Sequence, residues 1–178
     1  MKVELKAKEA CSNCGKAAAS IERGDFDLTQ FGVPVRLKGF NLIKCAECGH
    51  VDPIIPDMDT MMKLAAYHVV LKRSPLSGRE VRFLRKYVGK SARELAALLH
   101  VDHTHLSKIE NDNVEIGVQL DKYLRLLVIN LSSDLDIALK AFLDMLPTIQ
   151  DTRQPHCKMI NINPADLRQY QQPDHAHA

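Results

Sequence analysis

Four cysteines stand in two Cys-x-x-Cys pairs, and each pair is followed by a glycine: Cys11 and Cys14 before Gly15, then Cys45 and Cys48 before Gly49. Two thiolates at this spacing can bind one ion from a tight turn, and glycine suits the left-handed backbone that such a turn requires. Two turns of this kind complete a tetrahedral shell, which leaves no open ligand position and is therefore structural. The sequence predicts one structural zinc ion with four ligands: Cys11, Cys14, Cys45 and Cys48.

Other uses of paired cysteines fit less well. Disulfides are typical of secreted chains, and the first residues, Met-Lys-Val-Glu-Leu-Lys, contain no apolar signal segment, so a reducing, cytoplasmic environment is expected. A redox Cys-x-x-Cys motif needs no second copy with the same trailing glycine. Iron and redox thiols stay open as alternatives to zinc. Cys157 has no second cysteine nearby and is interpreted as a free thiol, and His50 as a solvated neighbour of the shell.

Length and charge limit the remaining possibilities. A chain of 178 residues can bury one sizeable core or two small ones, and the order of the motifs favours two. No apolar run approaches the length of a membrane span. The net charge of +2 says little about nucleic acid, but basic residues cluster locally at Arg73, Arg79, Arg82, Arg85, Lys86, Lys90 and Arg93. Such a run fits a DNA-facing surface and an ordinary solvated helix face equally well.

The pattern predicts an α+β chain with two domains and a tail. Residues 1–72 form a small zinc-binding, β-rich domain with short strands within 31–44 and a closing helix that Asp57 or Asp59 caps. Residues 73–146 are expected to form an all-α domain of short helices. Residues 147–178 are polar and expected to be mostly disordered, although 156–162 look strand-like.

Capping motifs locate the helices of the second domain. Ser77 with Glu80, and Ser91 with Glu94, have the spacing of a capping box, which predicts helices over 77–87 and 91–99. A turn then precedes a third helix to about residue 110, with Asp102 as its cap. Two apolar helices follow, from about 118 and from 132 to 146. Their apolar residues exceed what a five-helix core needs, so some are expected to contact a second copy of the chain.

The middle of the chain fits the requirements of a helix-turn-helix. Such a unit needs a small residue where its helices cross, an apolar residue in the turn, and apolar anchors on the second helix. These positions are held by Ala96, Val101, Leu106 and Ile109. The other face of that helix carries polar side chains able to hydrogen-bond base edges and phosphates: His103, Thr104, Ser107 and Lys108.

Residues 92–111, Ala-Arg-Glu-Leu-Ala-Ala-Leu-Leu-His-Val-Asp-His-Thr-His-Leu-Ser-Lys-Ile-Glu-Asn, resemble the signature of the phage-repressor (Cro-like, XRE) helix-turn-helix class. Together with the two cysteine pairs, roughly residues 11 to 130 resemble the MqsA-type antitoxins, which join a zinc domain to a dimeric repressor domain. The resemblance implies an ion pair between Arg85 and Glu110. The residues expected to contact DNA are Ser91, Ala92, Arg93, Asp102, His103, Thr104, Ser107 and Lys108.

Three positions depart from the resemblance. His100 holds the turn position usually occupied by glycine, although histidine tolerates positive φ better than most residues. Ala92 replaces a glutamine that many relatives use against the DNA backbone. Lys108 offers one ammonium where arginine gives a bidentate fork, so guanine discrimination is expected to be softer.

The predicted function is a homodimeric, zinc-stabilised transcriptional repressor that binds an operator in double-stranded DNA. The resemblance adds the role of antitoxin in a toxin-antitoxin pair, with the sheet edge around residues 33–43 contacting a small toxin. A stand-alone regulator with no toxin is the nearest alternative. An enzyme, such as a nuclease or a thiol oxidoreductase, is not expected, because no catalytic carboxylate pair, Ser-His-Asp set or His-Glu-x-x-His helix occurs.

Overall fold

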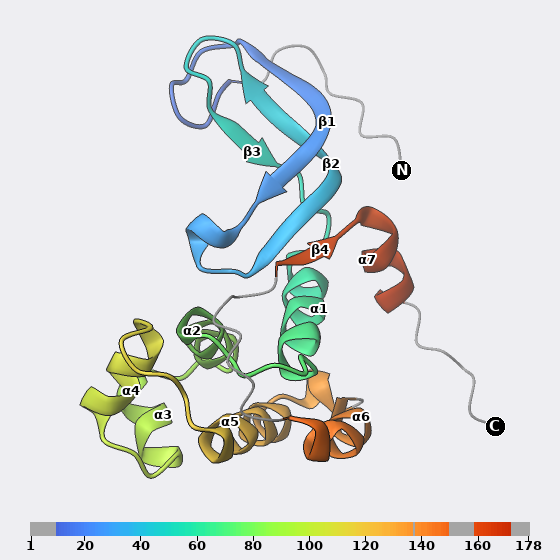
Figure 1. Cartoon of the computed structure of the whole chain (residues 1–178). Coiled ribbons are helices and arrows are strands. Elements are labelled where there is room, and N and C mark those ends of the chain that lie inside the picture. The colour runs from blue at the N-terminus through green and yellow to red at the C-terminus, as the bar shows by residue number, and fades with distance from the viewer. Residues whose placement is uncertain (1–9, 137, 150–158, 172–178) are drawn as a thin grey trace, which may run out of the picture.

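The computed structural model describes residues 10–136, 138–149 and 159–171, and it has an α+β fold in which a twisted sheet stands over a set of helices (Figure 1). Among the described residues, the helices are α1 (Met58–Val70), α2 (Gly78–Tyr87), α3 (Ala92–Leu98), α4 (His103–Glu110), α5 (Val118–Leu131), α6 (Ala138–Met145) and α7 (Pro164–Gln171). Short 3-10 turns lie at Thr29–Phe31, Ser133–Leu135 and Leu146–Thr148. None of the described helices combines the length and the apolar character required to cross a bilayer.

The sheet is built around one long central strand, β2 (Val35–Cys45). On one side β2 pairs along most of its length with the antiparallel strand β1 (Ala19–Asp27). On its other side the end near the cysteines pairs with the antiparallel strand β3 (Val51–Pro53), and the opposite end pairs with the parallel strand β4 (Ile160–Ile162). The central strand therefore has neighbours on both sides at each end.

The predicted helix starts are confirmed. Ser77 with Glu80 and Ser91 with Glu94 form complete capping boxes at α2 and α3, so each pair satisfies two backbone amides that have no helical partner. Asp57 caps α1 by accepting a hydrogen bond of 2.9 Å from the Thr60 amide. These local signals place the helices where the sequence predicted them, within two or three residues at each end.

Helix α1 connects the sheet to the other helices. Its buried face, which includes Met61, Ala65 and Val69, belongs to one continuous core that also contains Val35, Leu37 and Phe40 of the sheet and Leu84 of α2. Helix α1 contacts β4 and α7 on one side and α2 and α6 on the other. The two halves of the chain thus share a core, although the cysteine end of the sheet lies outside it.

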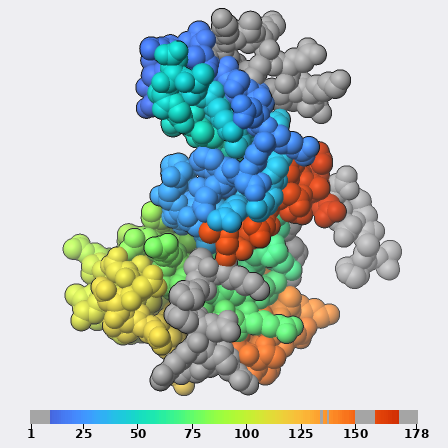
Figure 2. Space-filling model, turned by 45° about the horizontal axis from the view of Figure 1, so that its top comes forward, coloured from blue at the N-terminus to red at the C-terminus, as the bar shows by residue number. Residues whose placement is uncertain are grey.

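The strand-like pattern predicted within residues 156–162 is confirmed at β4, whereas the disorder predicted for the rest of the tail is wrong for α7. Strand β4 pairs with Val35–Leu37 of β2, and α7 packs on α1, so this C-terminal segment lies against the sheet (Figure 2, red against blue). The segment is ordered because it buries apolar side chains, Ile162 at 1% and Leu167 at 3% exposure, and because Asn163 accepts hydrogen bonds from two amides at the start of α7. Residues 150–158, with Cys157, and 172–178 lie outside the described part of the chain.

The same pairing corrects the expected toxin-binding edge. Residues 33–43 were expected to form an exposed sheet edge, yet they coincide largely with the central strand β2. The backbone amides and carbonyls of a central strand form hydrogen bonds with the neighbouring strands. Both ends of β2 are therefore already paired and are not the exposed edge that the prediction required.

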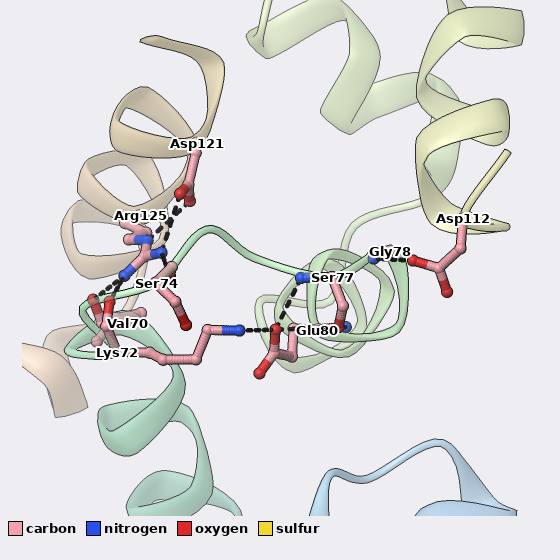
Figure 3. Close-up of polar contacts among 9 residues, drawn as sticks. All are labelled: Val70, Lys72, Ser74, Ser77, Gly78, Glu80, Asp112, Asp121 and Arg125. Carbon is pink, nitrogen blue, oxygen red and sulfur yellow. Dashed lines mark hydrogen bonds and ion pairs between the residues drawn. The ribbon is translucent and has the colours of Figure 1, made fainter. Parts of the chain in front are cut away.

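A buried arginine fixes the segment that links α1 to α2 (Figure 3). Arg125 of α5 and Asp121, one turn earlier, are both completely buried, and the guanidinium Nε and Nη2 atoms donate to the Asp121 carboxylate at 2.8 and 2.9 Å. The same guanidinium donates to three carbonyl oxygens at the end of α1 and in the linker, those of Val70, Lys72 and Ser74. One side chain thus holds the linker against α5.

Candidate metal centre and nucleic-acid interface

The four predicted metal ligands lie together at the far end of the sheet. Their sulfur atoms all fall within 4.8 Å of one another, and the Cys11–Cys48 and Cys14–Cys45 pairs are each 3.7 Å apart. Zinc–sulfur bonds of about 2.3 Å place the sulfurs of a tetrahedral site about 3.8 Å apart, so the observed separations suit such an ion. The four cysteines could hold a metal ion.

Both turns that present the sulfurs have the expected backbone. The Gly15 amide donates to the Cys11 carbonyl at 2.9 Å, and the Gly49 amide donates to the Cys45 carbonyl at 3.0 Å. Both glycines have positive φ, 72° and 70°. The second turn is also the connection from β2 to β3, so the pairing of these strands sets the position of Cys45.

Hydrogen bonds around the cluster give one of its thiols, that of Cys48, a pKa below the usual value, which makes it more acidic. Hydrogen bonds from the His50 backbone and then from the Asn13 side chain lower the pKa of Cys48 to about 6, which supplies one thiolate at neutral pH. Further thiolates so close together repel one another unless a positive ion lies among them. The His50 Nε2 atom lies 3.0 Å from an Asp52 carboxylate oxygen. This contact fits the prediction that His50 is a neighbour of the four ligands and not a fifth ligand.

Helices α3 and α4 follow one another with a short connection, and the residues predicted to join them make contacts there. Ala96 is 2% exposed where the two helices meet, and its carbonyl accepts from the Val101 amide in the turn at 3.0 Å. His100 adopts positive φ, 52°, as the glycine-like turn position requires. Leu106 and Ile109 are buried, at 1% exposure each, and anchor α4 on its neighbours.

The outer face of α4 is open to solvent. His103, Thr104 and Lys108 are exposed, and Ser107 is half-buried. Asp102 caps the helix by accepting from the Thr104 amide at 2.7 Å and from the Thr104 hydroxyl at 2.5 Å, and these hydrogen bonds lower the pKa of the Asp102 carboxyl. The Thr104 hydroxyl therefore holds the start of the helix, and its oxygen can still accept a bond from a base.

The remaining predicted contacts lie at the start of α3. Ser91 and Arg93 are exposed and Ala92 is half-buried. The Ser91 hydroxyl accepts a hydrogen bond of 3.2 Å from the Glu94 amide, so in this structure it caps α3. A single short turn, residues 99–102, joins the end of α3 to the start of α4.

The predicted ion pair between Arg85 and Glu110 is present. Arg85 donates two hydrogen bonds to the Glu110 carboxylate, at 2.6 and 2.9 Å, and a third to the Lys90 carbonyl at 3.0 Å. Glu110 is 5% exposed and raises the pKa of Arg85. The pair joins α2 to the end of α4, which is a structural role.

A close backbone contact at Gly78, the first residue of α2, was not among the sequence-based predictions. A Cβ atom at this position would lie 2.0 Å from the Ile109 carbonyl oxygen at the end of α4. The Gly78 amide also donates to the Asp112 carboxylate at 2.6 Å (Figure 3). A glycine directly after a serine cap, facing an Asn-Asp-Asn turn, is the signal that could have pointed to this contact.

We expect Gly78→Ala to lower the free energy of unfolding by about 1–3 kcal/mol, because α2 and α4 must separate to admit the methyl group. Denaturant unfolding followed by circular dichroism measures this. Gly117→Ala is the matched control, since a Cβ there meets nothing within 4 Å. Its cost should stay below about 1 kcal/mol, the scale of a changed N-cap. Equal losses in the two variants would contradict the close contact.

In comparisons with known proteins, no family model, no curated protein and no solved structure matches this chain.

Proposed function

We propose that this protein is a sequence-specific DNA-binding transcriptional regulator whose sheet is stabilised by one zinc ion. The observation that carries the proposal is helix α4, which presents His103, Thr104 and Lys108 to solvent while Leu106 and Ile109 fix its opposite face. A short helix of this kind fits the major groove of B-form DNA, where its polar side chains meet base edges. The start of α3 lies where a phosphate would approach.

The distribution of charge supports the helical half as the DNA-binding half. In the sheet, four basic side chains form ion pairs with carboxylates of the same half: Lys16–Glu47, Arg36–Asp27, Lys38–Asp25 and Lys44–Glu22. The sheet therefore adds little net positive charge. Around α2 and α3, Arg79, Lys86 and Arg93 are exposed, which suits contacts with the phosphate backbone.

Zinc is the proposed ion because four thiolates in a closed shell match its preference for sulfur and for tetrahedral geometry. The turn from β2 to β3 carries Cys45 and Cys48, and this end of the sheet lies far from α4 (Figure 1). The ion's role in this proposal is to hold the sheet together.

A homodimer is part of the proposal, since operators bound by this motif are usually two-fold symmetric. Several large apolar side chains of α5 and α6 are exposed, and we propose that they contact the second copy: Tyr123, Leu126, Leu131, Leu139 and Leu143. The Tyr123 hydroxyl also donates to the Leu98 carbonyl at 3.3 Å, so this surface adjoins the helix-turn-helix.

The role of antitoxin is proposed on the resemblance to the MqsA-type family alone. The alternative is a stand-alone regulator without a toxin partner. Expression of the chain together with its neighbouring genes, followed by affinity purification, separates the two: a small protein that copurifies in a fixed ratio supports the antitoxin, and its absence supports the stand-alone regulator.

Lys108→Ala tests the proposed interface. We expect it to weaken binding to the operator by about 1–3 kcal/mol and to relax the preference at one base pair, because the ammonium contacts a base edge. Fluorescence anisotropy with the operator and with all single-base variants measures both effects. Lys140→Ala, on the exposed side of α6, is the control and should leave binding unchanged. An equal loss on random DNA would assign Lys108 to a phosphate.

A further inference from the structure

We propose that three histidines around helix α4, His100, His103 and His105, make DNA binding by this surface dependent on protons, so that affinity rises as pH falls. The inference rests on the proposed function and adds a mode of regulation to the same site.

The fixed charges of the DNA-facing segment cancel. Residues 91–108 contain two basic side chains, Arg93 and Lys108, and two acidic ones, Glu94 and Asp102, which sum to zero. The same segment contains the three histidines, and all three are exposed. The segment is therefore neutral when the imidazoles are neutral and carries a charge of about +3 when each has bound a proton. The histidines therefore set the net charge of this segment and add to the attraction that the exposed Arg79 and Lys86 of α2 already exert on phosphate.

The positions of the three side chains suit contacts with the backbone on both sides of the groove. His100 lies in the turn between α3 and α4, His103 is the first residue of α4, and His105 follows two residues later. Residues two apart on a helix point to different faces. The set is thus spread around the exposed end of α4 and does not form one metal site.

The charged groups on neighbouring elements are mostly engaged elsewhere. The helices packed on α4 are α2 and α3. On α2, Arg82 contacts Asn111 and Arg85 contacts Glu110, both at the far end of α4. Glu80 contacts Lys72. Arg79 and Lys86 are exposed. On α3, Arg93 is exposed and Glu94 is bound to Ser91, and from α5 Tyr123 donates to the Leu98 carbonyl.

Asp102 is the acidic group that faces the histidines in the described part of the chain. Hydrogen bonds from Thr104, and to a lesser extent the charge of His103, lower the pKa of Asp102. Its carboxylate is already occupied by the amide and the hydroxyl of Thr104 at the start of the helix. The single carboxylate of Asp102 offsets part of the charge of three imidazolium groups, so a net positive charge still faces the DNA phosphates.

The direction of the effect follows from linkage. Phosphate stabilises the protonated form of an imidazole beside it, so DNA binding takes up protons. The affinity for DNA therefore rises as the pH falls through the interval of about pH 8 to 5, in which imidazoles generally gain protons. Each added phosphate contact steepens the dependence of log affinity on log salt by about 0.9. At about 0.1 M salt this corresponds to about an eightfold gain in affinity for each imidazole that contacts a phosphate.

The test uses the full-length protein and a duplex of roughly 30 base pairs with random sequence, because the electrostatic term is independent of sequence. Anisotropy titrations at several salt concentrations, near pH 8 and near pH 6, give the affinity and its salt slope. We expect the affinity of the wild type to rise at least about eightfold at the lower pH, with a slope steeper by about 0.9 to 2.7.

The variant that removes the three groups is His100→Asn with His103→Gln and His105→Gln, since asparagine accepts the positive φ of the turn. It should bind equally at both pH values. His68→Gln, on α1, is the matched control and should keep the wild-type response. Should the triple variant fail to fold, the double variant at the exposed helix positions 103 and 105 replaces it and should lose part of the slope change.

The outcomes separate the two claims. A pH response that survives the triple variant, or a wild type whose affinity is the same at both pH values, overturns the role of the histidines and leaves the DNA-binding proposal in place. Absence of binding to any DNA at either pH contradicts the proposed function itself.

Discussion

Replacing Cys14 by serine is expected to unfold the cysteine end of the sheet, residues 11–23 and 42–54, while the helices from α1 to α6 stay folded. The reason is that this end lies outside the continuous core, which takes Val35, Leu37 and Phe40 from β2 but no residue after them in that strand. The proposed zinc ion would contribute folding free energy of order 10 kcal/mol to this end of the sheet, where the continuous core does not reach. Hydrogen exchange read by mass spectrometry measures the loss segment by segment.

Cys157→Ser is the matched control, because it makes the same chemical change at a cysteine that is not one of the four proposed ligands. It should leave exchange at the sheet unchanged and one metal ion bound per chain. Addition of a strong chelator to the wild type should reproduce the exchange pattern of Cys14→Ser. Unchanged protection of residues 42–54 after either treatment would contradict the structural role of the metal.

Arg125→Met is expected to lower the free energy of unfolding by about 3–5 kcal/mol. The variant leaves the Asp121 carboxylate completely buried without its partner, and it removes the donors that satisfy three carbonyls at the end of α1 and in the linker. Because the linker then loses its attachment to α5, trypsin should also cut after Lys72 or Arg73 much faster than in the wild type. Denaturant unfolding and limited proteolysis measure the two effects.

A double substitution separates a lost ion pair from lost packing. Arg125→Met combined with Asp121→Leu removes both buried charges, so it should be less destabilising than Arg125→Met alone. The linker carbonyls still lack donors in this variant, so trypsin should still cut there. Gln119→Met, at an exposed position of the same helix, controls for the added methionine. A single variant as stable as this control, with an uncut linker, would contradict the proposed attachment.

The sequence predicted the parts of the fold that local chemistry determines. A glycine after each Cys-x-x-Cys pair marks a turn with positive φ, and both turns have it. The two Ser-x-x-Glu motifs mark helix starts because the side chains satisfy neighbouring amides, which needs no knowledge of the rest of the fold. The Arg85–Glu110 pair followed from a resemblance and is present, with both guanidinium contacts made.

The contacts that the sequence did not predict join residues far apart in the chain. Strand β4 has three residues and its pairing partner lies more than 120 positions earlier, so nothing in its local pattern reveals the sheet that it completes. Arg125 and Asp121 have the spacing of an ordinary exposed helix pair, and it is the end of α1 and the linker, whose carbonyls accept from Arg125, that make them a buried contact. Gly78 is likewise explained by the end of α4 and not by its neighbours in sequence.

The most direct test of the account is selection of fragments from host DNA by the purified protein, followed by sequencing and by titration of the recovered duplex with the wild type and with Lys108→Ala. We predict enrichment of one sequence with two related half-sites, bound by the wild type well above random DNA and more weakly by the variant. Recovery of fragments with no common sequence, bound no better than random DNA, would contradict the claim that α4 recognises an operator.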